Sequence, residues 1–150
     1  MNSPTNTWVL VASRVGARIY SAAHGRAPSM LEEIEHPEGR RRDSELDSDR
    51  PGRIFGRMGG GRHALGGSED SHEHSAVTFA KDLAMRLQKG RADGKYQRLF
   101  LVAEPRFLGY LRKALDTPTE ALVADAVGKD WWPLPEPELD RYVRDLLETA

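Results

Sequence analysis

The stretch that decides the fold is Leu99–Leu115, with the sequence LFLVAEPRFLGYLRKAL. Its first five residues, Leu99–Ala103, are all apolar, as expected for a strand that is buried on both faces of a sheet. Pro105 suits the first turn of a helix, and the apolar residues after it recur at helical spacing: Phe107, Leu108, Leu111 and Leu115. A buried strand that leads directly into an amphipathic helix indicates a sheet covered by helices.

The same alternation continues on both sides of this stretch. Before it, residues 71–89 form a predicted helix, because their apolar side chains also recur at helical spacing: Ala76, Phe79, Ala80, Leu83, Ala84 and Leu87. After it, residues 121–127 form a predicted fifth strand. A C-terminal amphipathic helix follows, with the apolar residues Leu139, Tyr142, Val143, Leu146 and Leu147.

The amino-terminal part of the chain predicts three strands in a meander, over residues 7–12, 17–22 and 30–35. The third run is ambiguous because the spacing of Met30, Leu31 and Ile34 also fits a helix; its short length and Pro37 favour the strand. Together the elements predict one α/β domain over residues 1–150. Its core is a mixed central sheet of about five strands flanked by helices.

Between the third strand and the first long helix the sequence changes character. Residues 37–67 contain only six strongly apolar side chains among many glycines and charges. Such a segment cannot bury enough apolar area to offset the entropy of ordering the chain. We therefore expect a long flexible Gly/Arg-rich loop over residues 37–70.

Composition excludes several kinds of chemistry. The chain has no cysteine, which excludes disulfides, zinc–thiolate sites, iron–sulfur clusters and thiol nucleophiles. Its first apolar run, Trp8–Ala12, is too short for a signal peptide or a membrane span, so we expect a cytoplasmic protein without membrane contact. The net charge is −1, so any affinity for nucleic acid must come from a local patch.

The expected loop contains the main candidate for a binding site. Three consecutive glycines let the backbone approach a ligand closely, and the flanking Arg57 and Arg62 can hold phosphates. Residues 38–62 contain seven arginines, no lysine and five acids, a net charge of +2. A solvated loop without a ligand is the alternative interpretation. The candidate nucleic-acid-binding residues are Arg50, Arg53, Arg57, Gly59, Gly60, Gly61, Arg62 and His63.

Metal binding and nucleophilic catalysis find little support. His63, His72 and His74 lie near several acids, but their spacing does not match HExxH, and residues two apart on a helix point to different sides. No GxSxG elbow is present, so we expect no metal and no cofactor. The adjacent Trp131 and Trp132 cannot both face one core. We expect one indole to pack on the C-terminal helix and the other to lie at the surface, where it could stack on a base or a protein partner.

A set of short stretches spread over nearly the whole chain forms a recognisable pattern: Trp8–Ala12, Ala17–Tyr20, His36–Arg40, Asp43–Leu46, Ser48–Arg53, Arg62–Ala64, His74, Phe79–Ala80, Leu99–Gly109 and Lys129–Asp130. The most specific are Ser48–Arg53, with the sequence SDRPGR, and Pro105–Gly109, with the sequence PRFLG. In these stretches the chain resembles the bacterial host-attachment protein family.

The resemblance implies a fold related to the middle domain of archaeal and eukaryotic peptide-release factors. It also implies that Gly59–His63 occupies the place of the catalytic Gly-Gly-Gln loop of those factors. The glutamine is missing here, and Lys129-Asp-Trp-Trp-Pro133 departs from the family's usual Lys-Asp-Leu-Thr. The resemblance therefore implies a non-catalytic or weakly catalytic protein that binds RNA or the ribosome through the Gly/Arg-rich loop. Two alternatives remain open: an ester hydrolase of the peptidyl-tRNA type that uses His63 to orient water, and a protein-interaction module involved in attachment to host cells.

Overall fold

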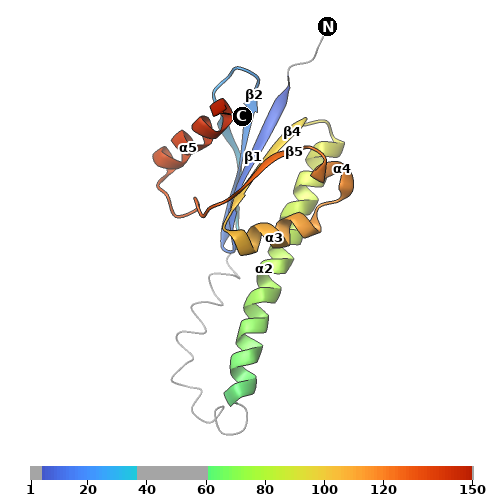
Figure 1. Ribbon diagram of the computed structural model, residues 1–150, viewed down its shortest axis with the longest axis vertical. Coiled ribbons are helices and arrows are strands. Elements are labelled where there is room, and N and C mark those ends of the chain that lie inside the picture. Colours follow the sequence, from blue (N-terminus) through green and yellow to red (C-terminus); the bar gives the residue numbers. More distant parts are fainter. Residues whose placement is uncertain (1–4, 37–60, 150) are drawn as a thin grey trace.

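The computed structural model describes residues 5–36 and 61–149, and within residues 61–70 it describes the backbone alone. Strands and helices alternate in its second half, as the sequence predicts (Figure 1). The elements are, in chain order, β1 (Asn6–Ser13), β2 (Gly16–Ala23), β3 (Ser29–Glu35), α2 (Gly61–Ala92), β4 (Arg98–Ala103), α3 (Pro105–Ala114), α4 (Thr117–Glu120), β5 (Val123–Gly128) and α5 (Glu136–Thr149).

The strands form one mixed five-stranded sheet in the order β3-β2-β1-β4-β5. β1, β2 and β3 pair antiparallel, so the meander is confirmed and the helical alternative for residues 30–35 is wrong. β4 pairs parallel to β1, and β5 pairs parallel to β4. The expected α/β class with a mixed central sheet is therefore confirmed.

Helices bury the central strands β1 and β4 on both faces, whereas the edge strand β3 is largely exposed. In β1, Trp8 and Leu10 face one side and Val9 and Val11 the other, because successive side chains of a strand alternate. The first pair belongs to the core beneath α2 and α3. The second pair packs with residues of α5. Figure 1 shows α5 on one face of the sheet and α2 and α3 on the other.

The first long helix begins earlier than the sequence predicts. A loop was expected over residues 37–70, but α2 already starts at Gly61, so that prediction is wrong for its last ten residues. Once residues 76–87 pack the helix against the sheet, extending it needs no new nucleus. Gly66 and Gly67 then cost only about 1 kcal/mol each relative to alanine. Residues 37–60 lie outside the described part.

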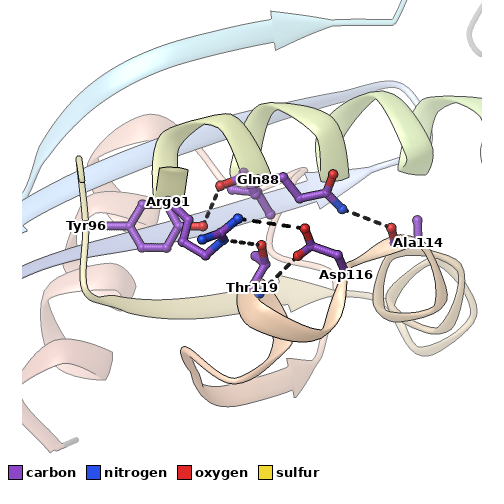
Figure 2. Close-up of polar contacts among 7 residues, drawn as sticks. Gln88, Arg91, Tyr96, Ala114, Asp116 and Thr119 are labelled. Carbon is purple, nitrogen blue, oxygen red and sulfur yellow. Dashed lines mark hydrogen bonds and ion pairs between the residues drawn. The ribbon is translucent and has the colours of Figure 1, made fainter. Parts of the chain in front are cut away.

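Polar contacts fix the other end of α2 against the connection between α3 and β5 (Figure 2). Arg91 donates through Nε to Thr119 Oγ1 over 3.0 Å, and its guanidinium lies 3.9 Å from Asp116. Asp116 in turn caps α4 by accepting the Thr119 backbone N–H. Within α2 and the following turn, the Tyr96 hydroxyl donates to the Leu87 carbonyl over 2.6 Å. Because these groups satisfy one another, the cluster holds α2 in place and leaves little hydrogen-bonding capacity for a ligand.

The two adjacent tryptophans pack on different elements, and both are half-buried. Trp131 meets Tyr142 of α5 edge to face, with ring centroids 5.2 Å apart, which confirms the expected packing on the C-terminal helix. Trp132 lies against β2, with the Arg18 guanidinium 5.3 Å from its ring centroid. A Cβ on Gly16 would lie only 2.5 Å from the Trp132 ring, so a glycine is needed there. Trp132 is thus held against the sheet while part of its ring stays exposed.

Among the described residues, no helix has the length and apolar character that crossing a membrane requires.

Candidate functional site

Four strands end at the same edge of the sheet. β1, β3, β4 and β5 all run in one direction, since β3 is antiparallel to β2, which is antiparallel to β1. β1 and β4 are neighbours in the sheet. After β1 the chain adds β2 on one side of this pair, and after β4 it adds β5 on the other side. In open α/β sheets such a reversal of strand order leaves a crevice outside the carboxyl ends, where ligands bind. We call this region the carboxyl edge; its residues are Arg14, His36, Glu104 and Lys129, which follow the four strands, and the part of α2 beside them.

His36 joins the end of β3 to α2. One nitrogen of its ring, Nε2, lies 3.0 Å from the Ser75 hydroxyl oxygen. The ring also stacks on Phe79, one helical turn further along α2, with centroids 4.3 Å apart and planes within 7°. Two contacts of different kinds therefore hold the imidazole in one orientation.

A second contact ties α2 to the turn after β1. The Arg14 guanidinium lies 3.1 Å from Nδ1 of His72. His72 and Ser75 are three residues apart and so share one face of the helix. The side of α2 that faces β1 and β3 is therefore polar at this level, whereas its apolar stripe begins at Ala76.

The start of α3 completes the carboxyl edge. Glu104 caps this helix, since its carboxylate accepts the backbone N–H groups of Arg106 and Phe107 over 3.2 and 2.8 Å. On α3 itself, the Tyr110 hydroxyl donates to Glu73 of α2 over 3.0 Å. Burial and this hydrogen bond raise the pKa of Tyr110 above its ordinary value. Glu73 and His72 thus contact different elements, α3 and the turn after β1, and the described residues contain no cluster of three metal-ligating side chains.

The chemistry of the carboxyl edge favours binding over nucleophilic catalysis. A serine hydroxyl beside an imidazole is the pairing that activates a nucleophile. Ser75, however, is only 8% exposed and lies inside α2, where backbone N–H groups are used by the helix itself. The helix around Ser75 therefore supplies, within the described part of the chain, no free pair of N–H groups to stabilise an oxyanion. The Ser75–His36 contact instead fixes α2 to β3.

The predicted binding residues are only partly within the described structure. Arg50, Arg53, Arg57, Gly59 and Gly60 lie outside the described residues. Gly61, Arg62 and His63 form the first turn of α2, so Gly61 belongs to a helix and not to the expected loop. That first turn lies at the end of α2 that extends beyond the sheet, far from the carboxyl edge (Figure 1).

Sequence reasoning missed the residues that the carboxyl edge brings together. His36 was assigned no role, and neither Ser75 nor Arg14 was singled out. His36 and Ser75 are separated by 39 positions, and neither sits in a motif with known spacing. The available signal was that a histidine directly follows a predicted strand, at the edge where α/β proteins place their sites.

Comparison with known proteins places the chain in a family. Residues 8–143 match the family described as "protein required for attachment to host cells", which covers the sheet from Trp8 onward and the first part of α5. No curated protein matches the chain. The resemblance seen in the sequence is thereby confirmed, and the chain belongs to the family of proteins required for attachment to host cells.

Proposed function

We propose that this host-attachment-family protein is a cytoplasmic, non-catalytic or weakly catalytic protein that binds RNA and associates with the ribosome. The binding residues are the arginines of segment 38–62, which leads into α2. A role in attachment to host cells is then indirect, through the RNA or ribosome that the protein engages.

The composition of this segment supports phosphate contact. All seven of its basic residues are arginine, whose planar guanidinium binds phosphate oxygens in pairs, whereas lysine acts as a point charge. The described side chains of the carboxyl edge do not offer an equivalent surface, because basic Arg14 and Lys129 lie among acidic Glu35, Glu73 and Glu104. The arginine-rich segment is therefore a stronger candidate than the carboxyl edge for attracting a polyanion.

The observation that carries the proposal is the position of the first turn of α2. From Gly61 to Ser71 the helix rises about 15 Å at 1.5 Å per residue, and Figure 1 shows this part standing clear of the sheet. Arg62 and His63 lie in its first turn, where the helix dipole also favours an anion. Arg62 thus lies on the part of α2 that extends away from the sheet.

Co-sedimentation with ribosomes tests the proposal. The double variant Arg57→Ala/Arg62→Ala is compared with the wild-type protein in cell lysate at low and at physiological salt. The control is Arg141→Ala/Arg144→Ala, which removes two exposed arginines from α5 on the other face of the sheet. The proposal expects the first variant to lose association while the control keeps it. Equal association of all three proteins, or none for the wild type at either salt, contradicts it.

A further inference from the structure

A small cavity lies between the start of β4, β5 and the end of α5, on the α5 face of the sheet. Its volume is about 200 Å³, and it is lined by Arg98, Phe100, Ala124, Asp125, Leu146 and Thr149. This space is much larger than one water needs, but smaller than the roughly 300–1,000 Å³ of pockets for drug-sized ligands. Its size therefore suits a small metabolite.

The cavity contains a cation that has no polar partner among the described residues. The Arg98 guanidinium lies over the Phe100 ring, 5.1 Å from the centroid. It forms neither a hydrogen bond nor an ion pair with any described residue, although it is half-buried. Asp125 lines the same cavity and uses one oxygen to accept the backbone N–H of Ala126 over 2.8 Å. Opposite charges thus line one space without pairing with each other.

The end of α5 adds a second negative element. Thr149 lines the cavity in the last turn of this helix, and its hydroxyl donates to the carbonyl oxygens of Asp145 and Leu146. The carboxyl end of a helix carries about half a negative charge. A simple anion would therefore meet repulsion from Asp125 and the end of α5, and a simple cation would meet repulsion from Arg98. A ligand that carries both charges satisfies both sides.

We propose that this cavity binds a free α-amino acid with an apolar side chain. Its carboxylate lies on Arg98, its ammonium group on Asp125, and its side chain against Phe100 and Leu146. The site shares no residue with segment 38–62, so it is separate from RNA binding, and either can fail without the other.

A matched set of ligands tests the proposal by amide-resolved NMR titration of the full chain. L-leucine carries both charges, 4-methylpentanoate lacks only its amine, and 3-methylbutylamine lacks only its carboxylate. We expect L-leucine to cause saturable shifts centred on Arg98, Asp125 and Leu146, and the other two compounds to bind at least about tenfold more weakly. The proposal is wrong if neither L-leucine nor L-alanine shifts these amides at tens of millimolar. It is also wrong if 4-methylpentanoate or 3-methylbutylamine binds as well as L-leucine.

Two variants then test the assigned contacts. Arg98→Gln removes the cation, and Asp125→Asn removes the anion while keeping the oxygen that accepts the Ala126 N–H. Each should weaken L-leucine binding about tenfold or more, whereas Arg141→Gln, on the exposed side of α5, should not change it. An unchanged amide spectrum away from the cavity shows that each variant is folded. L-leucine binding that survives both substitutions would overturn the assignment.

Discussion

Gly90, near the end of α2, offers a sharp test of how tightly this helix is packed. A glycine-to-alanine change inside a helix normally stabilises a protein by up to about 1 kcal/mol, because alanine loses less backbone entropy. At Gly90 the added Cβ would lie 2.6 and 2.7 Å from two carbons of the Trp8 ring and 3.2 Å from Tyr96. We therefore expect Gly90→Ala to destabilise the protein.

The magnitude follows from how firmly Trp8 is held. Its side chain is 7% exposed, and its ring centroid lies 4.7 Å from that of Tyr96, so the indole cannot move aside without displacing the core. Overfilling a packed core costs about 1–3 kcal/mol. After a helix gain of about 1 kcal/mol is subtracted, the net loss should be up to about 2 kcal/mol.

Urea denaturation measures the free energy of unfolding directly. Gly109→Ala is the matched control, because Gly109 is also inside a helix but a Cβ there would meet no atom within 4 Å. The two variants should shift the midpoint in opposite directions, with Gly109→Ala stabilising by up to about 1 kcal/mol. If Gly90→Ala is as stable as the wild type, or more stable, the packing of Trp8 against α2 is not as described.

Three further predictions concern stability. Glu104→Ala removes the cap of α3 and should lower the free energy of unfolding by about 0.5–2 kcal/mol, whereas Glu104→Asp should retain most of it in the same denaturation assay. Tyr96→Phe loses the hydroxyl bond to Leu87 and should cost about 1 kcal/mol. Tyr20→Phe should cost less, because the buried Tyr20 hydroxyl makes no hydrogen bond of good geometry within the described structure, although Asp140 and Arg18 lie close enough to shift its pKa; equal losses would refute this contrast. Burial raises the pKa of both tyrosines from 10.0 to about 12. Between these values the unfolded chain loses the phenol proton while the folded protein keeps it, so the free energy of unfolding should fall as the pH rises from about 10 to 12. The loss should reach up to about 3 kcal/mol for each tyrosine. Tyr96→Phe should show a smaller alkaline decline in unfolding free energy than the wild type, and an identical decline would contradict the assignment.

The elements that the sequence predicts correctly are those with local patterns. Leu99–Ala103 is a buried strand because five adjacent apolar side chains need cover on both faces, and β4 is buried accordingly. The stripe from Ala76 to Leu87 packs on the sheet as its helical spacing indicates. The ends of α2 were less predictable, because Gly61 and Gly90 have weak helix propensity but packing further along the helix outweighs it.

The candidate site depends more on long-range contacts. His36 finds Ser75 and Phe79 only when β3 and α2 are brought together, and nothing in the neighbouring sequence indicates that pairing. Arg98 and Asp125 meet at one cavity for a similar reason, since they come from neighbouring strands of the folded sheet. The arginines of segment 38–62, in contrast, are a property of composition, and they were found from the sequence alone.

The most direct test of the central proposal is the salt dependence of RNA binding. Fluorescence anisotropy with a labelled ribosomal RNA fragment gives the slope of log affinity against log salt for the wild-type protein and for Arg57→Ala/Arg62→Ala. Each lost phosphate contact lowers that slope by about 0.7–0.9, so the double variant should bind more weakly with a slope smaller by about 1.4–1.8. An unchanged slope, or a wild-type protein that does not bind the RNA at low salt, would contradict the proposal that these arginines hold phosphates.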